Sequence, residues 1–304
     1  MTALSWRALR LVLVCVLTGL PSARATTLVL VPSGDLPPAL ESIVDGVRDA
    51  ADDIDIRAVE AAELSVVLDS ASPGHEAVIV LGRELLEGND IVVDEVPILL
   101  GGFTGVVAGI PGLPYVSLNI DPEYALEQIE KTGSPINQIR SVLPPDAIVE
   151  PEVTALLSLE EIGIKNLAFA TGERATARAW FEILGSADGP DEMLWVVNDR
   201  HLDSSGTYRY LMENAWRQDL LVVSTIPSYA RRGVAVGFIP DLGAYGELLV
   251  QTIELLVDDP GHMPNPLLGA EVVQRVFNRR ALEHVGRRLP TDLDRAGRVD
   301  IIIE

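Results

Sequence analysis

The stretch Ala77-Val-Ile-Val-Leu81, followed by Gly82-Arg83, decides the fold class of this sequence. Five apolar residues in a row are typical of a strand that is buried on both faces, as in a parallel sheet covered by helices. Comparable runs begin at Thr27, Val96 and Met193, and each ends at a turn-forming residue. We therefore expect parallel strands at the centre of the fold.

Helical patterns separate these strands. Leu40, Ile43, Val44 and Val47 recur at spacings of three and four residues, which predicts an amphipathic helix. The same analysis predicts helices over 175–184, 208–217, 243–258 and 279–285, and strands over 55–59, 139–143, 166–170, 220–224 and 270–277. Alternating strands and helices indicate an α/β fold. Two units of about 110 residues fit the length of the chain better than one large sheet.

The first 25 residues have the pattern of a secretory signal peptide. Arginines precede an apolar run, and a small-residue cleavage pattern follows it: Arg7 and Arg10, residues 11–20, and Ala23-x-Ala25. A membrane anchor is the alternative, but a span needs about 20 apolar residues, twice the length of this run. Cys15, the only cysteine, lies inside the run. We therefore expect a cysteine-free mature protein in the periplasm.

The charge of the chain limits its partners. The sequence has 23 basic and 45 acidic residues, a net charge of −22. Removal of residues 1–25 leaves 20 basic and 45 acidic residues, a net charge of −25. A nucleic acid needs a basic surface to neutralise its phosphates, so nucleic acid is excluded as a partner. The strong negative charge favours a soluble monomer.

The sequence lacks the common signatures of enzymes and cofactor sites. It has no nucleophile elbow, phosphate-binding loop, zinc-protease motif or dinucleotide fingerprint. Its four histidines have no metal-ligand spacing: His75, His201, His262 and His284. The stretch from Asp292 resembles a calcium loop but has Ala296 and Ile303 where oxygen ligands belong, so we reject it. We expect no catalytic residue, no metal and no cofactor.

Two stretches near the C-terminus resemble a known family. Residues 229–246 contain Gly233, Asp241 and Gly246, and residues 276–290 have the ungapped pattern Asn278, Ala281, Gly286 and Pro290. Both resemble ABC transporter substrate-binding proteins of the tryptophan/tyrosine-binding type. Weaker similarity in the same order, at 77–82, 97–102, 105–122 and 193–199, extends over the mature chain.

This resemblance implies a type I periplasmic binding protein fold: two Rossmann-like lobes with parallel sheets, joined by a hinge. The implied domains are a signal peptide over 1–25, a first lobe over 26–115 plus 234–262, and a second lobe over 116–233 plus 263–304. A ligand is expected between the lobes, because ligands of parallel sheets bind at the carboxyl ends of the strands.

Residues that follow the expected strands are the candidate ligand contacts. Ser33 could offer a hydroxyl and a backbone N–H to a carboxylate, and Arg83 could clamp one, with a turn and a solvated arginine as the alternatives. Phe103 could stack on a ligand or pack internally. Asp199, the strongest candidate, could accept a ligand ammonium or cap a helix. Ser228 and Tyr229 could supply a hydroxyl and an aromatic wall to a ligand. The alternatives are that they cap a helix or are simply exposed at the surface.

Other residues at similar positions have simpler explanations. Asp241 is expected to cap the helix that follows it, and Trp195 and Trp216 are expected in the core.

The function implied by the resemblance is non-catalytic capture of a small ligand, such as an amino acid or similar metabolite, for an ABC permease. The alternatives are an orphan binding protein that presents its ligand state to a membrane sensor or outer-membrane receptor, and an exported α/β enzyme.

Overall fold

The structure is a computed structural model of the chain. It describes residues 26–71, 74–86, 91, 96–104, 112–133, 135–143, 154–155, 163–170, 172–187, 191–197, 200–203, 206–293 and 300–304. The expected signal peptide over 1–25 lies outside the described residues. In the described part of the chain, no helix is long and apolar enough to cross a membrane.

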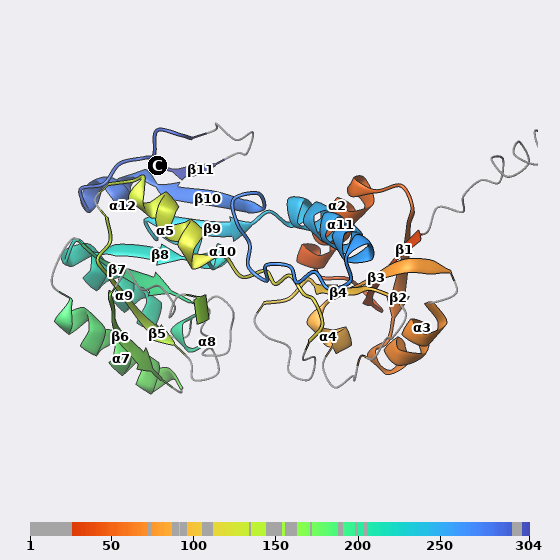
Figure 1. The fold of residues 1–304 in the computed structure, drawn as a ribbon. Helices are drawn as coiled ribbons and strands as arrows, with labels where there is room; N and C mark the ends of the chain where they lie inside the picture. The colour runs from red at the N-terminus through yellow and green to blue at the C-terminus, as the bar shows by residue number, and fades with distance from the viewer. Residues whose placement is uncertain are drawn as a thin grey trace, which may run out of the picture.

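The first lobe is built on a parallel sheet with the strand order β2-β1-β3-β4. The strands are β1 (Thr26–Pro32), β2 (Ile54–Val59), β3 (His75–Leu81) and β4 (Ile98–Gly101). Helices α2 (Pro38–Ala50) and α11 (Leu242–Asp258) cover one face of this sheet, and η1 (Ala61–Glu63), α3 (Leu64–Ala71) and α4 (Arg83–Leu86) lie on the other (Figure 1). The long apolar run that predicted β3 is buried throughout from Ala77 to Leu81, as expected for a doubly covered strand.

Two glycines allow α2 and α11 to approach closely. A Cβ on Gly46 would overlap the carbonyl of Gly243, and a Cβ on Gly246 would overlap the carbonyl of Ile43. The backbones of the two helices therefore touch where only hydrogen atoms fit between them. This contact fixes α11, which comes from the C-terminal third of the chain, onto the N-terminal lobe.

The second lobe contains a sheet with the strand order β11-β10-β9-β8-β7-β5-β6. Its strands are β5 (Gln138–Leu143), β6 (Gly163–Phe169), β7 (Glu192–Val196), β8 (Leu221–Ser224), β9 (Val236–Pro240), β10 (Val273–Asn278) and β11 (Ile301–Ile303). Pairing is parallel except between β9 and β10. Its helices are α5 (Pro122–Glu130), α7 (Glu173–Ser186), α8 (Arg200–Asp203), α9 (Thr207–Arg217), α10 (Pro227–Ala230) and α12 (Arg279–His284).

Side chains of β7 alternate between the two faces of this sheet. Met193 and Trp195 join the core cluster that contains α5, whereas Leu194 and Val196 join the cluster under α7 and α9. All four are fully buried. The α/β fold in two sheets agrees with the prediction, as does the expectation that Trp195 is a core residue.

Five described elements of the second lobe were absent from the sequence prediction: α5, α8, α10, β9 and β11. The helix α5 carries a recognisable start signal, because Asp121 caps it by accepting a hydrogen bond from the Glu123 N–H at 2.9 Å, and Pro122 follows. The strand β9 contains Gly237, where a Cβ would overlap Ala230, so the packing of α10 on β9 requires a glycine there.

The pairing of β9 also moves a lobe boundary. Residues 234–262 were expected in the first lobe, but Val236–Pro240 pairs with β8 and β10 in the second sheet. The chain therefore passes to the first lobe after Pro240. The expected end of α12 holds, since Gly286 adopts a positive φ of 74° just after this helix.

Candidate functional site

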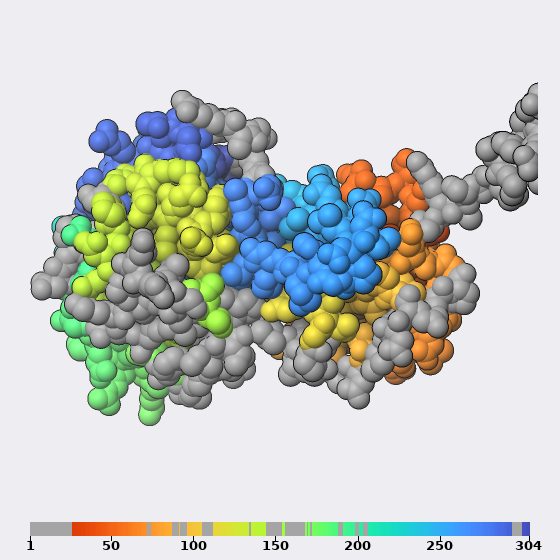
Figure 2. Space-filling model, in the orientation of Figure 1, coloured from red at the N-terminus to blue at the C-terminus, as the bar shows by residue number. Residues whose placement is uncertain are grey.

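Within the described residues, three chain segments cross between the two lobes, and the first and third are hydrogen bonded to one another. The Ser117 N–H and hydroxyl both donate to the Pro266 carbonyl, at 2.9 and 2.7 Å. Further along, the Asp121 N–H donates to the Leu268 carbonyl and the Leu268 N–H to the Asn119 carbonyl, at 2.9 and 2.8 Å. These bonds make a short parallel ladder, so the two segments act as one unit. Figure 2 shows the blue residues that follow α11 at the surface between the lobes.

The second crossing, between β9 and α11, is joined to the third by Asp241. Its N–H donates to the Val272 carbonyl at 2.8 Å, and its carboxylate accepts a hydrogen bond from the Gln274 amide at 3.1 Å. The same carboxylate accepts a hydrogen bond from the Ala244 N–H at 3.2 Å and so caps α11. The predicted capping role of Asp241 is confirmed.

Tyr245 connects α11 to the first crossing. Its hydroxyl donates to the Val116 carbonyl at 2.5 Å and accepts a hydrogen bond from the Gly102 N–H at 2.9 Å. The side chain is fully buried, and burial raises the pKa of its hydroxyl far above the ordinary value. The tyrosine therefore stays neutral and holds β4, α11 and the first crossing together. Sequence reasoning missed this residue because its two partners lie well over a hundred positions away.

The carboxyl ends of the strands carry the predicted ligand contacts of the first lobe. Ser33 follows β1 and is exposed, but its N–H donates to the Val59 carbonyl at 3.0 Å. The backbone N–H that was expected to be available for a ligand is therefore used within the sheet. Arg83 is exposed at the first position of α4.

Phe103 lies deeper, at the base of the first crossing. It is 4 % exposed, its ring centroid is 6.1 Å from that of Tyr115, and its carbonyl accepts a hydrogen bond from the Leu118 N–H at 2.8 Å. The structure therefore places this side chain in internal packing, which was the alternative considered for it.

In the second lobe the predicted contacts divide in the same way. Ser228 is exposed on α10, whereas Tyr229 is 2 % exposed and stacks on Tyr208 with ring centroids 4.6 Å apart. The Arg232 guanidinium lies 4.5 Å from the Tyr208 ring and 5.6 Å from the Tyr229 ring. Tyr229 thus belongs to the core of the lobe. Asp199 lies outside the described residues, between β7 and α8.

The helices that follow these strand ends lie on facing sides of the two lobes. Figure 1 shows α4, after β3, and α8, after β7, on the sides that face one another. Among the residues that the structure describes, no group of three or more His, Cys, Asp or Glu side chains could hold a metal ion. The exposed side chains described at these edges carry hydroxyls, on Ser33 and Ser228, and a guanidinium, on Arg83.

Comparison with known proteins supports the architecture through structure alone. No protein-family model and no curated protein matches the sequence.

Among solved structures, a substrate-binding protein with adhesive properties from Clostridium difficile, in its ligand-free, open form, matches 92 % of this chain and 99 % of its own. The TM-score is 0.62 at 14 % identity. A sugar-binding protein of a sugar ABC transporter from Bacillus halodurans matches 86 % of this chain and 99 % of its own, with a TM-score of 0.51 at 13 % identity. Two α/β lobes joined by three crossing segments, together with these matches, show that this chain has the type I periplasmic binding protein fold.

Proposed function

We propose that this chain is an exported binding protein that captures a small ligand between its two lobes and delivers it to an ABC importer. The observation that carries the proposal is the set of three crossing segments, which are hydrogen bonded to one another and form the junction between the lobes. A junction that stays intact while the lobes turn about it is the structural basis of hinge closure.

The proposed mechanism is a shift between an open and a closed state, without catalysis. A ligand that contacts both lobes binds the closed state better, and that difference in affinity is what shifts the population. Tyr245 supports such a mechanism because it fastens β4 and α11 to the crossing as one body. The closed form is then the state that a membrane permease recognises.

We place the ligand at the carboxyl ends of the strands. Exposed Ser33 and Arg83 would serve from the first lobe, and Ser228 and Asp199 from the second. A guanidinium pairs well with a carboxylate, and the Asp199 carboxylate is suited to an ammonium group. An amino acid or a similar metabolite carries both groups, so it is the ligand class that we propose.

The periplasm is the proposed location, based on the signal-peptide pattern of residues 1–25. A second role, reporting the ligand state to a membrane sensor, would use the same ligand-driven closure. Genes for a permease and an ATPase beside this one would support import, whereas a sensor gene in their place would support signalling.

A thermal-shift screen of amino acids, short peptides and related metabolites tests the proposal. A ligand should raise the melting temperature in proportion to the logarithm of its concentration over its dissociation constant. In Asp199→Ala, at least about ten times more ligand should be needed for the same rise in melting temperature, since the change removes a charge-assisted hydrogen bond. The control Asp258→Asn, at the exposed end of α11, should leave the shift unchanged. Failure of every compound in the screen to stabilise the protein would contradict the proposal.

A further inference from the structure

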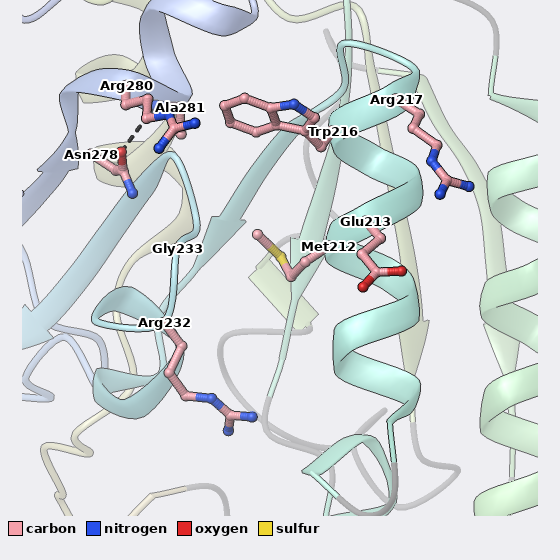
Figure 3. Close-up of a pocket in the computed structure, with 9 residues that line it drawn as sticks. All are labelled: Met212, Glu213, Trp216, Arg217, Arg232, Gly233, Asn278, Arg280 and Ala281. Carbon is pink, nitrogen blue, oxygen red and sulfur yellow. Dashed lines mark hydrogen bonds between the residues drawn. The ribbon is translucent and has the colours of Figure 1, made fainter. Parts of the chain in front are cut away.

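A groove of about 490 Å³ opens on the second lobe between α9, the loop before β9 and the residues after β10 (Figure 3). The residues that matter most for its chemistry are Met212, Trp216, Arg232, Gly233, Arg280 and Ala281. The volume is within the range of small-molecule sites, which is roughly 300–1,000 Å³.

This groove lies at the opposite edge of the sheet from the proposed ligand site. Trp216 precedes the start of β8, Gly233 precedes the start of β9, and Asn278 is the last residue of the antiparallel β10. All three positions are at the amino ends of the parallel strands, whereas the proposed ligand contacts follow their carboxyl ends. The groove is therefore a separate place on the lobe, although Arg232 also contacts the Tyr229 ring on α10, next to Ser228.

The walls of the groove are apolar and fixed in position. Trp216 is 40 % exposed, although it was expected in the core, and its ring stacks on His284 at 3.6 Å between centroids with an angle of 3°. His284 is itself held by the Trp216 carbonyl and the Asp219 carboxylate, at 2.7 and 3.1 Å from its Nε2. A positive φ of 103° at Gly233 shapes the opposite wall, where a Cβ would lie 3.9 Å from the Met212 methyl group. His284 therefore covers one face of the indole and sets the orientation of the part that stays exposed.

An arginine lies at each end of this apolar surface, in a chain whose net charge is −22 (Figure 3). The Arg280 guanidinium lies 5.7 Å from the Trp216 ring, and the Arg232 guanidinium lies 4.5 Å from the Tyr208 ring. Both side chains are exposed, and both contacts are cation–π contacts that orient a guanidinium. Glu213 also lines the groove, but its carboxylate is paired with Arg209 at 2.9 Å. In Figure 3 the Arg217 side chain points to the other side of α9, away from the Trp216 ring.

We propose that this groove binds a small organic anion with a flat apolar body. The apolar body would lie against Trp216 and Met212, and the anionic group would pair with Arg280 beside the indole. Arg232, at the other end of the groove, adds positive charge. Charge complementarity supports an anion, because a guanidinium pairs with a carboxylate or sulfonate through two hydrogen bonds. The volume of about 490 Å³, within the range of small-molecule sites, favours a small molecule over an acidic segment of a partner protein.

Two probes with the same aromatic framework test this proposal: anilinonaphthalene sulfonate, and phenylnaphthylamine, which lacks the sulfonate. Equilibrium dialysis against the purified protein should show saturable binding of the sulfonate, at least about tenfold tighter than that of the neutral probe. The double variant Arg232→Gln/Arg280→Gln should weaken sulfonate binding about tenfold and leave the neutral probe within a factor of two. Trp216→Leu should weaken both probes.

Arg174→Gln, which removes an exposed arginine from α7, is the matched control and should bind both probes as the wild type does. Melting curves of each variant check that the fold is intact. The proposal is overturned if the double variant binds the sulfonate within a factor of two of the wild type. It is also overturned if a hexaglutamate peptide binds with the same arginine dependence and the sulfonate does not, because the site would then serve an acidic partner.

Discussion

The two lobes have the same layered architecture but are stabilised by different chemistry. In the first lobe, α2 and α11 meet at Gly46 and Gly246, where the fit between backbones decides the packing. In the second lobe, Arg140 and Arg275 are buried with carboxylate partners. Among the described residues, the buried charged residues all belong to the second lobe: Arg140, Glu192, Arg275 and Arg287, with the Asp300 side chain also buried. Shape therefore limits substitutions in one lobe, and charge balance limits them in the other.

The geometry of the charged clusters is specific. Arg140 makes two hydrogen bonds to Glu192, at 2.6 and 2.9 Å, and two more to Ser186. Arg275 makes two to Asp300, at 2.9 and 2.6 Å, and also contacts Asp292 and Gln128. The second cluster ties the C-terminal strand β11 and the residues after α12 to the centre of the lobe.

The largest effect is expected at the contact between α2 and α11. Gly246→Val would force a side chain into the backbone of α2 near Ile43, so the helices must separate and expose the core. We expect a loss of about 4 kcal/mol or more, or failure to fold. Gly243→Ala is the control, since its Cβ would meet only Asp241 at 3.7 Å and alanine favours a helix. Urea denaturation measures both; a mild effect of Gly246→Val would refute the close-packing account.

A somewhat smaller effect is expected from breaking the buried ion pair of the second lobe. Glu192→Ala leaves the Arg140 guanidinium, 4 % exposed, without its carboxylate, which should cost about 3 kcal/mol. The control is Glu182→Ala, which breaks the exposed pair with Arg178 and should cost less than about 1 kcal/mol. Equal losses in the two variants would show that charge burial does not distinguish this lobe.

The junction between the lobes should show an intermediate effect. Tyr245→Phe removes the hydroxyl that serves the Val116 carbonyl and the Gly102 N–H, and leaves both backbone groups buried without it. The expected loss is about 2 kcal/mol in chemical denaturation. Tyr210→Phe, whose ring stacks on the exposed Phe181, is the matched control and should change stability little. If Tyr245→Phe leaves the free energy of unfolding unchanged, the junction is not held by this residue.

The smallest effect is a pH dependence that arises in the second lobe. Burial alone would raise the pKa of Asp292, but Arg275 and Lys131 outweigh it and hold the pKa below the ordinary value. A depressed pKa in the folded state stabilises the protein above about pH 4, and this stabilisation is lost as the pH falls below that value. Asp292→Asn should flatten the decline in urea midpoint between pH 4 and pH 2. The exposed Asp258→Asn should leave it unchanged, and identical pH profiles for all three proteins would argue against the assignment.

The sequence predicted the strands whose burial leaves a strong pattern. The apolar runs at 77–81 and 193–197 correspond to β3 and β7, and the predicted caps and helix ends at Asp241 and Gly286 are found. The strand β9 was missed because Gly237, which the packing of α10 requires, interrupts its apolar pattern. Strand order and the antiparallel pairing of β10 depend on contacts between distant segments, which a local pattern does not contain.

The candidate site was predictable only as a set of positions after strands. Ser33, Arg83 and Ser228 are exposed as a ligand contact must be, whereas Phe103 and Tyr229 are buried. An aromatic residue after a strand has the same sequence signature whether it lines a site or packs beneath it. Trp216 shows the converse, because it was expected in the core but is 40 % exposed. Its ring stacks on His284, 68 residues further along the chain, a contact that no local pattern contains.

Ligand-driven closure of the two lobes is the central claim, and the distance between the lobes tests it most directly. Spin labels at Ser65→Cys on α3 and Arg174→Cys on α7, in a Cys15→Ser background, would report that distance by pulsed electron resonance. The compound that raises the melting temperature most should shift the distance distribution to shorter values, and should fail to do so in Asp199→Ala. An unchanged distribution with saturating ligand bound would contradict closure.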